Sequence, residues 1–178
     1  MKHILVATVE NKPGVLNRVS SLFRRRNFNI DSLTVGETES HEVSRMTIVV
    51  DASRTSATLV RENLYKLVNV IDVQDVTNSP AVVRDLLLIR VTCDASRRAE
   101  VMQVADIFRG KIVDVAPDSV IVELTGEEDK INSFIDLMRP FGIEEMVRTG
   151  LVAMARGTTN VNGHRNGDSA RLGEKYSV

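Results

Sequence analysis

The 178-residue chain has one cysteine, no tryptophan, five phenylalanines and two tyrosines. A single cysteine can form no disulfide within the chain and cannot supply a zinc site built from several cysteines, and it fits a protein kept in a reducing compartment. Few aromatic rings also disfavour a surface that stacks nucleic-acid bases. We therefore expect Cys93 to be a small core residue in a cytoplasmic protein.

Neither sign of charge predominates, because 23 lysines and arginines face 24 aspartates and glutamates. A chain of net charge −1 has no broad positive field for nucleic acid or for an anionic membrane. The longest apolar runs, such as Leu86–Ile89, fall far short of the roughly 20 residues that cross a bilayer. No charged leader with an apolar stretch precedes the first strand-like segment at His3, so we expect no export signal, membrane or nucleic-acid partner.

Several short motifs that often carry catalysis are missing, namely GxxxxGK[ST], GxGxxG, GxSxG, HExxH and CxxC. The histidines His3, His41 and His164 have no evident catalytic partner and fit solvated or edge-strand imidazoles. The acidic run Glu127–Asp129 lies where a helix is expected to begin, and the helix dipole favours acids there. We therefore predict no catalytic residue and no metal ligand.

Residues 1–78 carry strand and helix patterns in the order βαββαβ. Residues 3–10 are apolar on both alternating faces, as in a strand covered on each side. Apolar spacing predicts the remaining elements, which are a helix at about 13–26, strands at 28–37 and 42–51, a helix at 55–68 and a strand at 70–76. Pro13 is expected in the first turn of its helix and Arg24–Arg26 in the last turn.

The same order of elements recurs after a break at Asn78–Pro80. The expected segments are a linker at 79–85, a strand at 86–93, a helix ending near Gly110, a hairpin of 111–116 with 119–125, a helix ending at Pro140, a strand at 143–148 and a short strand at 151–156. The predicted fold is therefore α+β, with two ferredoxin-like modules at 1–78 and 86–156. Residues 157–178 lack apolar periodicity and are expected to form a disordered tail.

The segment from Glu10 to Leu16 joins the first expected strand to the first expected helix. The N–H groups that open a helix lack intrahelical acceptors and attract anions. Gly14 would let a carboxylate approach the backbone, and the Asn11 amide offers a donor and an acceptor. An apolar pocket wall is expected from Val15, Leu16 and Ile30. The segment thus fits an α-amino-acid site, but it also fits a plain helix start with Asn11 as N-cap.

The stretch ENKPGVLNRVSSLFRRRNFNIDSLTVG, followed by SRMTIVV, closely resembles the small regulatory subunits of acetolactate synthase (acetohydroxyacid synthase), and the first module resembles an ACT domain. The specific part covers roughly residues 1–80, with weaker support from FRGKIVDV at 108–115. This resemblance implies a non-catalytic chain that binds and activates a large catalytic subunit carrying thiamine diphosphate, Mg²⁺ and usually FAD. It also implies feedback inhibition by valine in branched-chain amino-acid biosynthesis.

The resemblance further assigns residues to the effector site, between the ACT domains of a homodimer. By motif match, the effector-binding turn comprises Asn11, Gly14, Val15 and Leu16. Asn29 and Ile30 would face this turn across the dimer interface, although Asn29 fits a plain turn residue equally well. Discrimination among valine, leucine and isoleucine stays open, because one methylene is worth only about 1–3 kcal/mol in an apolar pocket. A free-standing ACT-domain sensor that regulates another enzyme is the alternative function.

Overall fold

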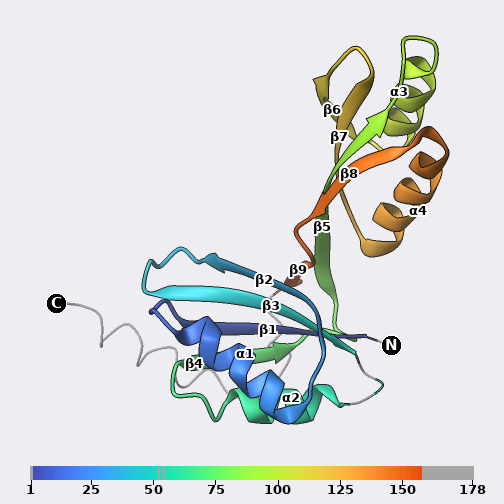
Figure 1. Cartoon of the computed structure of the whole chain (residues 1–178). Helices are drawn as coiled ribbons and strands as arrows, with labels where there is room; N and C mark the ends of the chain where they lie inside the picture. Colours follow the sequence, from blue (N-terminus) through green and yellow to red (C-terminus); the bar gives the residue numbers. More distant parts are fainter. Residues whose placement is uncertain (1, 52, 54, 158–178) are drawn as a thin grey trace.

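The computed structural model describes residues 2–51, 53 and 55–157. These residues form two α+β modules, each with an antiparallel sheet and helices on one face, and one long strand, β5, runs from the first module into the second (Figure 1). The predicted fold class is therefore confirmed.

The first module has a four-stranded sheet in the order β2-β3-β1-β4. Its elements are β1 (Lys2–Glu10), α1 (Val15–Arg26), β2 (Ile30–Glu37), β3 (Val43–Asp51), α2 (Ala57–Leu64) and β4 (Val70–Asp75). Leu5 and Ile48 on the sheet pack with Phe23 of α1 in one core whose members exclude almost all solvent. The alternating and helical apolar spacings in the sequence point to this same core.

The second module repeats the arrangement with the strand order β6-β7-β5-β8. Its elements are β5 (Ala81–Thr92), α3 (Arg98–Ile107), β6 (Lys111–Val115), β7 (Ser119–Gly126), α4 (Glu128–Met138), a short 3₁₀ turn η1 (Arg139–Phe141) and β8 (Ile143–Arg148). Phe134 of α4 packs on Ile89 and Val122 in a separate core, which also contains Cys93 as predicted. Each module thus has its own hydrophobic centre.

The linker expected over residues 79–85 is, from Ala81 onward, the first part of β5. Residues 81–84 pair with the short strand β9 (Val152–Ala155), which confirms the strand expected over 151–156. This two-stranded ribbon covers the outer face of the first sheet, where Ala81 and Val83 pack against Val6 of β1. The linker prediction failed because the partner strand is about seventy residues away in the sequence.

Two helix boundaries also differ from the sequence prediction. Pro13 precedes the N-cap, Gly14, and so lies outside α1 rather than in its first turn. Helix α2 ends at Leu64, and residues 65–69 form a turn in which the Val70 N–H donates to the Leu67 carbonyl. Arg24–Arg26 occupy the last turn of α1 as expected. The predicted disordered tail falls, beyond residue 157, outside the described residues.

Candidate functional site

The turn from β1 into α1 is open at Gly14. Its φ of 85° is in the left-handed region, which glycine adopts without the steric penalty of a β-carbon. A β-carbon added at this position would meet no atom within 4 Å, so space is free above the backbone. No side chain caps the helix, and Asn11 is therefore not the N-cap.

The first turn of α1 presents backbone donors to this space. The Val15 N–H makes only a long 3.3 Å bond to the Lys12 carbonyl. Within the described chain, the N–H groups of Leu16 and Asn17 have no acceptor. Since these groups lie at the positive end of the helix dipole, the turn is suited to a carboxylate.

Asn11 is held beside this turn by the loop that joins β2 to β3. Its Nδ2 donates to the His41 carbonyl oxygen at 2.8 Å and to Glu37 Oε1 at 3.3 Å. The amide oxygen of Asn11 then remains to accept a hydrogen bond from a ligand ammonium. Sequence analysis missed Glu37 and His41, which only the pairing of β2 and β3 beside β1 brings here.

A second polar network surrounds Glu10 at the end of β1. It closes the other side of the Gly14 corner, the space bounded by Asn11 and the first turn of α1. Asn69 Nδ2 donates to Glu10 Oε2 at 2.5 Å, and Arg18 Nη1 donates to Asn69 Oδ1 at 2.6 Å. The hydrogen bond from Asn69, helped by Lys12 Nζ at 3.3 Å, lowers the pKa of Glu10 below its usual value. The corner therefore combines a carboxylate held in its ionised form with two nearby cations.

The three predicted apolar wall residues have different environments. Val15 is only 5% exposed and belongs to the core, so it presents its backbone rather than its side chain to the corner. Ile30 is partly buried against the same core. Leu16, at 46%, is exposed and free to contact a ligand or a second chain.

Asn29 and Ile30 lie at the opposite end of α1 from Gly14. A 12-residue helix is about 18 Å long, so a ligand at Gly14 cannot also reach Asn29 of the same chain. Asn29 Nδ2 donates to Asp31 Oδ1 at 2.9 Å and lines a shallow pocket of about 400 Å³ with Phe28 and Asp51. The single chain therefore does not bring the six predicted residues together.

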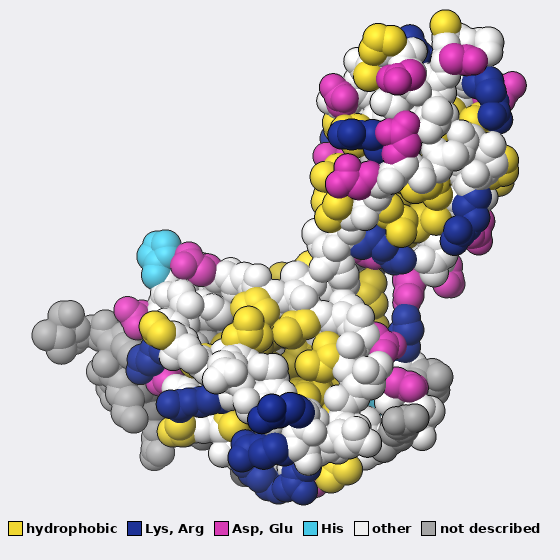
Figure 2. All heavy atoms as spheres, viewed as in Figure 1, with side chains coloured by type: hydrophobic (Ala, Val, Ile, Leu, Met, Phe, Trp, Pro, Cys, Tyr) yellow, Lys and Arg dark blue, Asp and Glu magenta, His cyan; other side chains and the backbone are white. Residues whose placement is uncertain are grey.

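The surface between α1 and β2 is partly apolar. Figure 2 shows hydrophobic side chains gathered over the middle of the first module, and the exposed ones on these elements include Leu16 and Val35. Strand β2 pairs only with β3 among the described strands, so its outer edge carries unpaired backbone groups.

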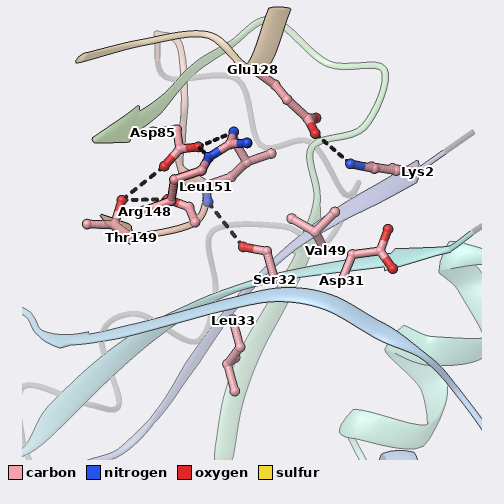
Figure 3. A pocket seen from close by; sticks show the side chains of 11 residues that line it. Lys2, Asp31, Ser32, Leu33, Val49, Asp85, Glu128, Arg148, Thr149 and Leu151 are labelled. Carbon is pink, nitrogen blue, oxygen red and sulfur yellow. Dashed lines mark hydrogen bonds and ion pairs between the residues drawn. The ribbon is translucent and has the colours of Figure 1, made fainter. Parts of the chain in front are cut away.

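Another pocket, of about 410 Å³, lies between the two modules (Figure 3). On one side Lys2 Nζ contacts Glu128 Oε1 at 2.6 Å across the modules. On the other side Arg148 Nε donates at 2.7 Å to Asp85, whose side chain is 1% exposed. None of the six predicted site residues lines this pocket.

The described residues include neither a cluster of metal-ligating side chains nor a helix able to cross a membrane. No group of three or more histidine, cysteine or acidic side chains among them is arranged to hold a metal ion. Equally, none of the helices within residues 2–157 that the structure describes has the length and apolarity required to span a membrane.

Both modules match known protein families. A family model for the AHAS small subunit-like ACT domain matches residues 5–72, and one for the small subunit of acetolactate synthase matches residues 84–157. A probable acetolactate synthase small subunit of Archaeoglobus fulgidus is 54% identical over 157 residues, which cover 88% of this chain and 98% of that protein. The Bacillus subtilis acetolactate synthase small subunit is 45% identical over 159 residues, covering 89% and 92% of the two chains.

A solved structure agrees with the order and arrangement of the elements. The crystal structure of the acetolactate synthase small subunit from Thermotoga maritima superposes with a TM-score of 0.82 at 40% identity, covering 89% of this chain and 99% of that chain. Since sequence and structure match over nearly the full length of these relatives, this chain belongs to the family of acetolactate synthase small subunits.

Proposed function

We propose that this chain is the regulatory subunit of acetolactate synthase in branched-chain amino-acid biosynthesis. It binds the large catalytic subunit in the cytoplasm, raises its activity and makes it sensitive to feedback inhibition by valine. The catalytic partner carries thiamine diphosphate, Mg²⁺ and FAD, and this chain carries no cofactor. The match to named small subunits along nearly their whole length supports this role over that of a free-standing sensor.

The open turn at Gly14 is the observation that carries the effector assignment. The valine carboxylate accepts from the N–H groups of Leu16 and Asn17, where the helix dipole favours negative charge. The valine ammonium donates to the amide oxygen of Asn11, and Glu37 supplies negative charge beside it. The exposed Leu16 side chain contacts the isopropyl group.

A second copy of the chain completes the site. Strand β2 begins at Ile30 and ends at Glu37, and Glu37 is bonded to Asn11 of the effector corner. When two β2 edges align antiparallel, the start of one strand lies beside the end of the other. Asn29 and Ile30 of the second copy then approach the Gly14 corner, and a symmetric dimer holds two such sites.

Valine bound at this dimer interface contacts both chains, so it favours the arrangement of the dimer that fits it best. A difference of about 1–3 kcal/mol between two arrangements is enough for strong regulation of the catalytic partner. Activation and inhibition then depend on different contacts, which makes them separable by mutation.

The substitution Gly14→Asp tests the effector site, with Gly14→Asn as the matched control. Both side chains tolerate the left-handed conformation better than other residues do, and they have nearly the same size. Only aspartate places a negative charge where the ligand carboxylate binds. In the enzyme reconstituted with its catalytic partner, we expect Gly14→Asp to raise the half-inhibitory valine concentration at least about tenfold more than Gly14→Asn, which corresponds to about 1.4 kcal/mol.

Activation of the catalytic partner should survive in both variants, because Gly14 lies at the effector corner. Calorimetric titration of each chain with valine, leucine and isoleucine would show binding directly and rank the three effectors. Equal valine inhibition of the wild-type, Gly14→Asp and Gly14→Asn enzymes would place the effector elsewhere.

A further inference from the structure

The chain crosses twice between the first module, with its covering ribbon, and the second sheet. Strand β5 pairs with β9 up to Arg84 and with β8 from Leu87 onward. On the return path, residues Thr149–Leu151 join β8 to β9, with Gly150 in the left-handed region at φ 84°. Because these two neighbouring segments are the only backbone connections between the ribbon and the second sheet in the described chain, they have the geometry of a hinge (Figure 1).

Strand β2 contacts one side of this hinge directly. The Leu151 N–H donates to Ser32 Oγ at 3.1 Å, and Thr34 Oγ1 donates to the Thr149 carbonyl oxygen at 3.3 Å. A β-carbon at Gly150 would collide with Ser32 Oγ, which shows how closely the hinge backbone rests on β2. The position of β2 therefore constrains residues 149–151.

The two crossing segments are also joined to each other. The Leu86 N–H donates to Thr149 Oγ1 at 3.1 Å, and the Thr149 N–H donates to the Leu86 carbonyl oxygen at 3.1 Å. The buried Asp85 binds Arg148 at the end of β8. A displacement at residues 149–151 is thus passed to both β5 and β8, and the second module moves with them.

The space between the modules leaves room for such a displacement. The pocket of about 410 Å³ separates Ser32 and Val49 on the first sheet from Asp85 and Arg148 on the second module (Figure 3). Its other border is the exposed ion pair of Lys2 with Glu128, a type that stabilises a structure only weakly. Interfaces of this polar, incompletely filled kind permit relative motion of domains.

We propose that β2 and residues Thr149–Leu151 form a regulatory hinge, in which effector occupancy at the start of β2 sets the angle of the second module. This inference rests on the proposed effector site, which includes Asn29 and Ile30. Between Ile30 and Ser32 the pairing of β2 with β3 shifts register. Such an irregularity bends a strand locally, so β2 can respond to a ligand at Ile30 and move Ser32.

The angle can be measured by electron–electron double resonance between two spin labels on the full chain. Labels at Ser20→Cys on α1 and Ile107→Cys on α3 report the distance between modules, in a Cys93→Ala background that removes the only native thiol. Dilution with unlabelled chain restricts the signal to distances within one chain. We expect saturating valine to shift or narrow the distance distribution.

The hinge variant is Ser32→Ala with Thr34→Val, which removes both hydroxyl contacts from β2. The matched control is Ser133→Ala with Thr92→Val, because these hydroxyls bond only within the second module. We expect the hinge variant to bind valine within about threefold of the wild-type affinity but to show no valine-dependent change in distance. With the catalytic partner, its half-inhibitory valine concentration should rise at least tenfold, whereas the control should match the wild type.

The outcomes separate the hinge from the effector site. If calorimetry shows that the wild-type chain binds valine but its distance distribution does not change, the hinge proposal is wrong and the effector site stands. A hinge variant that keeps the wild-type response in distance and inhibition would also overturn it. If the wild-type chain binds none of valine, leucine or isoleucine, the proposed effector site and the hinge both fail.

Discussion

At the scale of single residues, Glu10 links the effector corner to the stability of the first module. The hydrogen bond from Asn69 lowers the pKa of Glu10, so the folded chain binds fewer protons at this group than the unfolded chain. The stabilisation is present above the pKa of Glu10 in the unfolded chain, near 4.5, and is lost as the pH falls through its lower pKa in the folded chain.

We predict that Glu10→Gln weakens the dependence of stability on acid. Between pH 6 and pH 3, the melting temperature of the wild-type chain should fall further than that of Glu10→Gln, as measured by thermal unfolding. Glu39→Gln, which removes the same charge outside this network, is the control and should keep the wild-type dependence. Parallel curves for the wild type and Glu10→Gln would show that the Asn69 contact does not favour the carboxylate.

A second residue-scale prediction concerns Asp85 and Arg148, whose exposures are unequal. The Asp85 side chain is 1% exposed and that of Arg148 is 29% exposed. Loss of Arg148 leaves a buried carboxylate without its cation, whereas loss of the Asp85 charge leaves an arginine that water can reach.

Arg148→Met should therefore cost about 3–5 kcal/mol of unfolding free energy. Asp85→Asn should cost less, about 1–3 kcal/mol, because it removes a charged hydrogen bond without leaving a buried ion. Urea denaturation of both variants checks this order. A larger loss of unfolding free energy in Asp85→Asn than in Arg148→Met would mean that the arginine, rather than the carboxylate, is the group that needs its partner.

At the scale of elements, β2 has three roles, because it borders the effector corner, forms a sheet edge and contacts the hinge. Its Val35 side chain is 42% exposed on an edge that lacks a partner strand among the described residues. In the proposed dimer this edge meets its own copy. A charge placed at Val35 therefore faces a like charge or a desolvated surface across the seam.

We predict that Val35→Glu shifts the chain toward monomer. Sedimentation equilibrium should show the dimer dissociation constant rising at least about tenfold, equivalent to about 1.4 kcal/mol, and valine binding should weaken with it. Val113→Glu is the matched control, since Val113 is 51% exposed on β6, the edge strand of the second sheet. Dissociation by Val113→Glu alone would move the dimer contact to the second module.

At the scale of the whole molecule, two separate cores joined by a hinge suit a chain that transmits a signal. In the proposed role, the catalytic partner performs the chemistry and this chain changes its rate. The purified chain, incubated with pyruvate, thiamine diphosphate and Mg²⁺, should form no acetolactate.

Addition of this chain to the purified catalytic subunit should raise the rate of acetolactate formation several-fold, and valine should reverse the gain. The Gly14→Asp chain serves as the internal control, because it should activate without conferring inhibition. Acetolactate formation by the isolated chain would contradict the regulatory assignment, and so would an unchanged rate with the catalytic subunit.

Local patterns in the amino-acid sequence were enough to predict the order of strands and helices in both modules. Apolar spacing depends on residues close together in the chain, so the boundaries of most strands could be predicted to within a few residues. Local chemistry likewise pointed to Gly14, since a glycine between a strand and a helix is a local signal. The inward direction of Val15, however, depended on how α1 packs on the sheet.

Which distant segments of the chain meet became visible in the three-dimensional structure. It placed Ala81–Arg84 in a strand because β9 lies beside it. It also brought Ser32 of β2 against Gly150 of the hinge. These contacts join residues some seventy to one hundred and twenty positions apart, and no local pattern encodes them, because they arise when two folded surfaces pack together.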